Sequence, residues 1–249
     1  MNQKESKLCR NCGESSIGRY CPNCGQRKAI YKVTFRETIQ DFVDAVFTVN
    51  APLFMTLKGL FVHPGKLLLE FLEGQRKKYY KPVAFFLLTT VVYLVIRSLI
   101  GFNPFGNTLI QVQDGAETGR LLTEARNYML LNINNLLFIF VFTLALFSKL
   151  FFYKKQTLAE FLAISFYMTG VYTLIVTLNM FLIQYVSLQL QPLAVVVMCV
   201  YYLYAMISFF HKPKFIILLK SIVLYFLAFI SYGLLGFGLS FLIVYSKQL

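Results

Sequence analysis

Long apolar stretches, separated by short polar segments, run through the last two thirds of the chain. Five of them are long enough to cross the hydrocarbon core of a bilayer, which needs roughly twenty helical residues. They occupy residues 82–100, 129–148, 161–183, 192–210 and 221–245. Their apolar residues cover nearly all helical faces, as in helices surrounded by lipid and by one another. The pattern predicts an all-α polytopic membrane protein with about five transmembrane helices within residues 82–249.

Residues 32–81 show an amphipathic pattern before the first long apolar stretch. Thr34 and Glu37 have the spacing of a capping box, which opens helices. Between residues 35 and 47, apolar side chains recur at helical spacing on one face, while acidic and other polar residues take the opposite face. We expect this helix to lie beside the membrane and to pack on protein, because its acidic face is a poor match for anionic lipid.

Residues 51–72 are also apolar, but charged residues and the Pro64-Gly65 pair interrupt them. We predict a short helix that starts near Pro52, a turn at Pro64-Gly65, and a second helix that Gly74 ends. A membrane crossing in this segment would disturb the charge distribution of the whole chain. The sequence leaves open whether the segment lies at the membrane interface or re-enters the membrane.

The charge distribution predicts an orientation in the membrane. Hydrophobic residues make up 57% of the chain and charged residues only 14%, which is too apolar for a protein surrounded by water. If the N-terminus is cytosolic, twenty of the twenty-four Lys and Arg residues are cytosolic, and the outer ones are Arg97, Arg120, Arg126 and Lys247. The positive-inside rule thus accounts for the net charge of +13 without a nucleic-acid ligand. We expect a cytosolic N-terminus and an external C-terminus.

Residues 1–31 contain two copies of one short cysteine motif. Cys9 and Cys12 belong to the first Cys-x-x-Cys-Gly sequence, and Cys21 and Cys24 belong to the second. Two residues between thiolates let a tight turn aim both sulfurs at one ion, and the glycine relieves the strain of that turn. Four thiolates complete the tetrahedral shell of a structural Zn²⁺ ion, although iron accepts the same ligands. The spacing predicts a small zinc-ribbon-like module.

The predicted zinc module is a better match for a protein partner than for a nucleic acid. Four basic residues between Arg10 and Lys28 would permit contacts with phosphate. Only Tyr20 and Tyr31, however, offer aromatic rings on which bases could stack. We therefore expect the module to contact protein or to dock on its own chain.

A basic and aromatic collar directly precedes the first predicted span. It consists of Arg76, Lys77, Lys78, Tyr79, Tyr80 and Lys81. Cations gain about 1 kcal/mol each beside an anionic leaflet, and tyrosines favour the membrane interface. The collar is expected to fix the topology, with specific binding of lipid headgroups as the alternative. Within the spans, Arg97 is the best candidate for an intramembrane functional residue, because charges at that depth are costly.

The junction between the module and the first span resembles a known family. The residues that carry the resemblance are Thr56-Leu57, Leu60, Pro64-Gly65-Lys66, Phe71, Gly74-Gln75-Arg76-Lys77-Lys78-Tyr79 and Pro82, with Cys-Pro-x-Cys-Gly-Gln upstream. Together they resemble a family of bacterial multi-pass membrane proteins that is known only as a domain of unknown function. The resemblance extends from Cys9 to about Phe86. It implies a location in the bacterial inner membrane, and it implies no activity.

These features favour a membrane-anchored platform over an enzyme. We expect the zinc module and the adjoining helices to contact a cytosolic or membrane protein, with membrane lipids as further partners and a homo-oligomer as an additional option. The main alternative is a transporter or channel for a neutral or apolar substrate, because the spans bury almost no charge. A lipid-modifying enzyme ranks third, because such chemistry needs paired acids, histidine or a metal with an open position.

Overall fold

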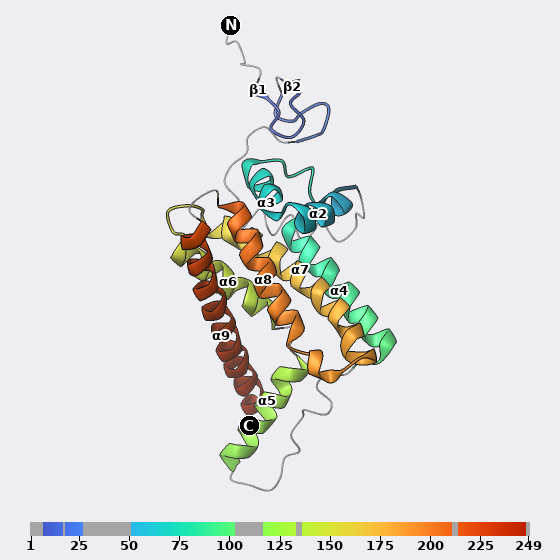
Figure 1. Cartoon of the computed structure of the whole chain (residues 1–249), viewed down its shortest axis with the longest axis vertical. Helices are drawn as coiled ribbons and strands as arrows, with labels where there is room; N and C mark the ends of the chain where they lie inside the picture. Colours follow the sequence, from blue (N-terminus) through green and yellow to red (C-terminus); the bar gives the residue numbers. More distant parts are fainter. Residues whose placement is uncertain are drawn as a thin grey trace.

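The chain forms a helical bundle that carries a small cysteine-rich segment at one end (Figure 1). The computed structural model describes residues 7–16, 18–26, 51–102, 117–132, 136–210 and 214–247. In the cysteine-rich segment, strands β1 (Lys7–Leu8) and β2 (Ser15–Ser16) pair antiparallel, with Leu8 opposite Ser15. The amphipathic helix predicted between residues 35 and 47 lies outside the described residues.

Five helices form the body of the bundle. They are α4 (Pro82–Ile100), α6 (Leu137–Phe151), α7 (Leu158–Tyr185), α8 (Leu193–Phe209) and α9 (Lys214–Ser246). Within the described residues, four stretches are long and apolar enough to cross a membrane, namely α4, α7, α8 with the preceding 3-10 turn η1 (Leu188–Leu190), and α9. The predicted all-α membrane architecture is confirmed, and these four stretches coincide with four of the predicted spans.

The remaining predicted span, over residues 129–148, is displaced in the structure. Helix α5 (Glu117–Leu131) ends where this span was expected to begin, and α6 starts only at Leu137. The sequence between the two helices is rich in asparagine, which has a low intrinsic helix propensity. At the end of α5, the backbone N–H and the side-chain nitrogen of Asn132 both donate to the carbonyl oxygen of Tyr128, each at 3.0 Å. With 15 residues, α6 is shorter than a full span, and the sequence did not predict α5.

Helix α7 is the centre of the bundle. In its most apolar stretch 72% of the residues are buried, against 33% in α4, α8 and α9, so those helices are left to face lipid. Small and hydroxylated residues let its neighbours approach closely. A Cβ atom on Gly170 would lie 2.6 Å from the Phe85 ring of α4, and Thr173 donates to Thr89 Oγ1 at 2.7 Å.

Two short helices lie across the end of the bundle that carries the cysteine-rich segment (Figure 1). They are α2 (Ala51–Val62) and α3 (Pro64–Glu73). The predicted stop at Gly74 is confirmed, and Gly74 adopts the left-handed conformation with φ 117°. The turn predicted at Pro64-Gly65 is wrong, because the break falls at His63 and both residues belong to the first turn of α3, where proline is favoured. With 12 and 10 residues, each helix is too short to cross a bilayer.

Contacts from α8 fix this helix pair to the bundle. The hydroxyl of Tyr201 donates to the carbonyl oxygen of Leu60 at 3.1 Å, and that of Tyr204 donates to the carbonyl oxygen of Val62 at 3.0 Å. Both acceptors belong to the last turn of α2, where carbonyls lack partners within the helix. Gly65 lies against the α8 backbone, since an added Cβ would meet the carbonyl carbon of Ser208 at 2.2 Å.

The two ends of the bundle differ in the elements they carry (Figure 1). The cysteine-rich segment, α2, α3 and the connection between α6 and α7 lie at one end, whereas α5 and the end of α9 lie at the other. The chain therefore runs away from the cysteine-rich segment in α4, α7 and α9 and returns in α6 and α8. This arrangement separates the cysteine-rich segment from the last residues of α9 by the length of the bundle.

The tight approach of Gly65 to α8 gives a first prediction. Gly65→Ala forces α3 away from Ser208, and such overpacking costs about 1–3 kcal/mol, so the melting temperature in detergent falls. Gly238→Ala on α9 is the matched control, because nothing lies within 4 Å of the added Cβ atom. The readout is the temperature at which half of the protein loses its monodisperse elution peak. Equal melting temperatures for the two variants would contradict the close contact.

Candidate metal centre

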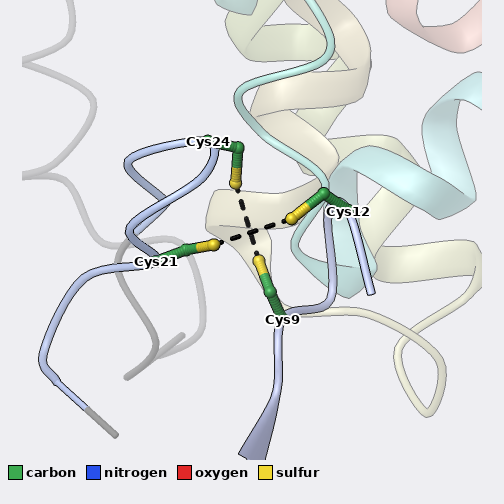
Figure 2. Close-up of side chains that lie close together, drawn as sticks. All are labelled: Cys9, Cys12, Cys21 and Cys24. Carbon is green, nitrogen blue, oxygen red and sulfur yellow. Dashed lines mark hydrogen bonds between the residues drawn. The ribbon is translucent and has the colours of Figure 1, made fainter. Parts of the chain in front are cut away.

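The four cysteines of the two predicted knuckles lie together (Figure 2). Their sulfur atoms all lie within 4.8 Å of one another. Sγ of Cys9 is 3.7 Å from Sγ of Cys24, and Sγ of Cys12 is 3.6 Å from Sγ of Cys21. Four thiolates placed about 2.3 Å from a central ion would stand about 3.8 Å apart, so this cluster has the dimensions of a tetrahedral metal site.

Each knuckle is built by the same backbone turn. The N–H of Gly13 donates to the carbonyl oxygen of Cys9 at 2.8 Å, and the N–H of Gly25 donates to that of Cys21 at 2.9 Å. Both glycines have positive φ angles, 76° and 66°, which other residues rarely adopt. The glycine after each second cysteine is therefore required by the turn that brings the two sulfurs to one side.

Two of the four cysteines are buried, and the thiol of a third has a lowered pKa. Cys9 and Cys21 are buried, whereas Cys12 is exposed. Burial tends to raise the pKa of the Cys24 thiol, but the backbone N–H of Gln26, the Asn11 side chain and the neighbouring thiols together lower this pKa to about 6. A thiolate is thus favoured at one of the four positions near neutral pH, and an arriving ion would displace protons from the others.

The cysteine-rich segment docks on the C-terminal end of α3. The guanidinium of Arg10, which lies between the first two cysteines, donates to the carbonyl oxygen of Glu73 at 3.3 Å. The side-chain amide of Gln26, just after the second knuckle, donates to the carbonyl oxygen of Gly74 and is 4% exposed. These two carbonyls lie at the C-terminal end of α3, where carbonyl groups lack partners within the helix. Sequence analysis did not single out Gln26, although its place after Cys-Gly is part of the motif.

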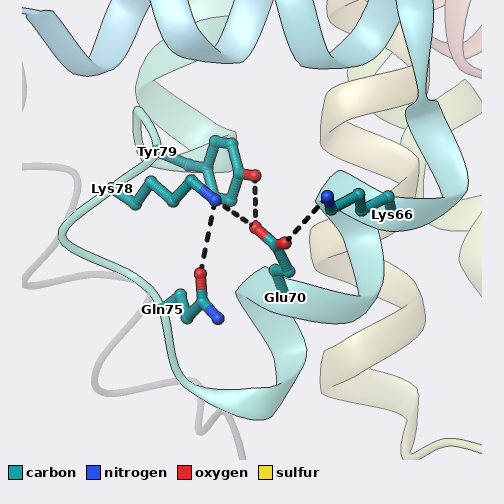
Figure 3. Close-up of polar contacts among 5 residues, drawn as sticks. All are labelled: Lys66, Glu70, Gln75, Lys78 and Tyr79. Carbon is teal, nitrogen blue, oxygen red and sulfur yellow. Dashed lines mark hydrogen bonds and ion pairs between the residues drawn. The ribbon is translucent and has the colours of Figure 1, made fainter. Parts of the chain in front are cut away.

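The collar is built into the fold around the carboxylate of Glu70 (Figure 3). Nζ of Lys78 lies 2.5 Å from Glu70 Oε2, and the Tyr79 hydroxyl donates to the same oxygen at 2.6 Å. Lys66 reaches the other oxygen at 3.9 Å from one turn away. The side chain of Glu70 is 16% exposed, so this ion pair is largely shielded from water. Sequence analysis missed Glu70, and its helical spacing from Lys66 was the available signal.

The backbone of Tyr80 joins the collar to two helices. Its N–H donates to Thr56 Oγ1 of α2 at 2.7 Å, and its carbonyl oxygen accepts a hydrogen bond from the Tyr167 hydroxyl of α7. Lys77 extends toward the second knuckle, because a Cβ atom on Gly25 would lie 4.0 Å from its Nζ. Arg76 and Lys81 complete the collar and also take part in further interactions. The collar thus connects α2, α3 and α7 beside the cysteine cluster.

The charged states of Glu70 and Lys78 depend on each other. Burial tends to raise the pKa of Glu70, but the hydrogen bonds from Lys78 and Tyr79 and the nearby cations outweigh it and lower the pKa below its ordinary value. The hydrogen bond to Glu70 is the main cause that raises the pKa of Lys78. Both shifts favour the charged pair.

Arg97, the intramembrane candidate, lies in the last turn of α4 and therefore at the opposite end of that helix from the collar. Its Nε donates to the carbonyl oxygen of Phe102 at 3.2 Å, just beyond the helix. Gly101 ends α4 in the left-handed conformation with φ 65°. The structure places Arg97 where it stabilises the end of its own helix, and it does not bring Arg97 near the cysteines.

Helices that are long and apolar enough to cross a membrane, together with a cluster of four cysteines, define a class: a membrane protein with a candidate metal site. A family described as a protein of unknown function (DUF3667) matches residues 51–94. The matched segment contains α2, α3, the collar and most of α4, and the chain is similar to that family over this segment. No curated protein and no solved structure gave a significant match.

The cysteine geometry predicts metal retention in the purified full-length protein. We expect about one ion per chain by elemental analysis, and loss of it in Cys21→Ser. Cys199→Ser, which removes a thiol on α8 outside the cluster, is the control and should keep the ion. Retention against a chelator should weaken as the pH falls toward the Cys24 pKa of about 6, because protons then compete for the thiolates. Equal metal content in wild type and Cys21→Ser would contradict the site.

The Glu70 cluster predicts a stability effect that depends on pH. Glu70→Gln removes the charge paired with Lys78 and should lower stability by about 1–3 kcal/mol at neutral pH. Because the pKa of Glu70 is lowered in the folded protein, the stability contributed by its charge is complete above pH 4.5. It disappears as the pH falls further, through the lowered pKa. The measurement compares melting temperatures across pH. Glu73→Gln, at an exposed neighbouring position, is the control; a pH-independent difference would contradict the ion pair.

Proposed function

We propose that this protein is a non-enzymatic, multi-pass protein of the bacterial inner membrane that presents a zinc-held cytosolic platform to a protein partner. The observation that carries this proposal is the docking of both knuckles on α3 through Arg10 and Gln26. Because of these contacts, the cysteine-rich segment occupies a defined place above the helix bundle. A surface fixed in this way offers a partner a constant shape.

The charge distribution supports a cytosolic location for the platform. The elements at the platform end of the bundle carry the collar, Lys58, Lys66, Lys149, Lys154, Lys155 and Lys220. The opposite end carries four cations, namely Arg97, Arg120, Arg126 and Lys247, together with Glu124. Under the positive-inside rule, the platform end faces the cytosol and α9 ends outside. In the cytosol the four cysteines would stay reduced, and their thiols would remain available to a metal.

Zinc is the proposed ion, and its role is structural. All four ligands are cysteines, and their separations match those of a closed tetrahedral site with no position left for substrate. A segment this small has little core of its own, so binding of the metal, on the order of 10 kcal/mol or more, supplies its folding free energy. Iron fits the same ligands, and elemental analysis with visible absorption distinguishes the two metals.

Exposed side chains indicate which surfaces meet other molecules. On the metal-held segment, Leu8 is 71% exposed and Tyr20 is 61% exposed. Exposed apolar and aromatic groups on a rigid support are typical of protein-binding surfaces. On α2, Phe54 and Phe61 are also exposed, and Lys58 lies between them. We assign this face of α2 to the lipid headgroup region, where apolar residues with a basic neighbour bind favourably.

The platform is tested by separating metal binding from docking. Full-length protein is cross-linked in its native membranes and purified in mild detergent, and the cross-linked proteins are quantified by mass spectrometry. Cys21→Ser should lose the partner because the surface unfolds. The double variant Arg10→Ala, Gln26→Ala keeps the metal but releases the segment from α3, and we expect about tenfold less cross-linking.

Cys199→Ser serves as the control, and it should retain the wild-type set of cross-linked proteins. A partner that persists unchanged in both Cys21→Ser and the double variant would refute the platform. In that case the transmembrane helices would carry the interaction.

A further inference from the structure

A cavity of about 380 Å³ lies inside the bundle, in the half away from the cysteine cluster. It is lined by residues of α4, α6, α7, α8 and α9, and its wall is made mostly of apolar and aromatic side chains such as Met180, Val195 and Phe229. Tyr93, which also lines it, is about 10 Å along α4 from the end of that helix. Phe102, just beyond α4, and Gln191, just before α8, line it as well, so the cavity extends from the apolar interior to the end of the bundle away from the cysteine cluster.

One buried polar group in the cavity wall lacks a partner. Asn179 of α7 is 4% exposed and lines the cavity. Its amide nitrogen donates to the carbonyl oxygen of Leu190 at 3.0 Å, and this bond fixes which end of the amide is the oxygen. The oxygen, Oδ1, is buried and has no hydrogen-bond partner among the residues the structure describes. An unsatisfied carbonyl in such surroundings is costly, and a bound donor would remove the cost.

We infer that this cavity binds an uncharged amphiphile whose hydroxyl or N–H group donates to Asn179 Oδ1. The described lining contains no Lys, Arg, Asp or Glu, which disfavours charged ligands at this depth. The volume is more than twice the roughly 150 Å³ that accommodates benzene, so the ligand has about a dozen to twenty non-hydrogen atoms. A medium-chain alcohol meets these requirements, with its hydroxyl at Asn179 and its chain along the apolar wall.

The cavity also reaches the surface of the bundle. Pro192 and Phe229 both line it, and both are exposed. Because Phe229 lies near the middle of the apolar helix α9, an amphiphile can enter sideways from the membrane beside it. Binding here uses no residue of the cysteine cluster or the collar, so the inference stands apart from the platform, and Cys21→Ser should leave it intact.

The test uses full-length protein in phosphatidylcholine vesicles and a photoreactive diazirine derivative of dodecanol as the probe. Mass spectrometry maps the labelled peptides, which should come from α7 and α8. Dodecanol should compete about tenfold better than dodecane, which lacks the donor, and better than dodecanoate, which is charged. Asn179→Leu should weaken competition by dodecanol about three- to thirtyfold, the range measured for hydrogen bonds within membranes.

Two further variants separate binding from folding. Thr177→Val removes a buried hydroxyl of α7 that does not line the cavity, and labelling should persist. Val176→Phe fills the cavity without breaking a hydrogen bond, and labelling should be lost. If Asn179→Leu fails to elute as a monodisperse peak, Val176→Phe and the comparison of dodecanol with dodecane decide the question. Equal competition by dodecane and dodecanol, or labelling that survives in Val176→Phe, would overturn the inference.

Discussion

Carbonyl groups at helix ends need donors from elsewhere, and this requirement organises the N-terminal part of the protein. Tyr201 and Tyr204 of α8 supply donors to the end of α2. Arg10 and Gln26 of the cysteine-rich segment supply donors to the end of α3. The same kind of interaction thus attaches α2 to the bundle and the cysteine-rich segment to α3. Neither helix is long enough to be held in place by the membrane alone.

The magnitudes of these interactions differ. Metal binding by such a small segment is worth on the order of 10 kcal/mol, whereas each docking hydrogen bond contributes about 0.5–1.5 kcal/mol. A metal ion at the four cysteines would therefore stabilise the segment far more than its docking on α3 does. Release from α3 costs far less than loss of the ion. A partner could consequently move the segment as an intact body, and the half-buried pair of Glu70 and Lys78 would still hold α3 against the collar.

The sequence predicted what depends on local composition and missed what depends on distant neighbours. Spans at α4, α7, α8 and α9 follow from uninterrupted apolar residues, and both knuckles follow from cysteine spacing. The expected start of the second span was wrong, since α5 ends at Leu131 and α6 begins at Leu137, on either side of a stretch rich in asparagine. Gln26 and Glu70 were missed because Gly74 and Tyr79, which form hydrogen bonds with them, become their neighbours only in the fold. The cavity is likewise formed by five helices and leaves no local pattern.

Helix α7 connects the two regions of interest in the protein. The hydroxyl of Tyr167 binds the collar at Tyr80, and Asn179 lines the cavity about 18 Å further along the same helix. Most residues of the central stretch of α7 are buried, so it moves only if α4, α6 and α8 adjust with it. A ligand at Asn179 would therefore affect the platform only if the protein had two conformations that differ in the packing of α7 and the ligand bound one of them more tightly. Close contacts such as that of Gly170 with Phe85 restrict the ways in which α7 can pack. They favour a helix that supports the platform rigidly over one that couples ligand binding in the cavity to the platform.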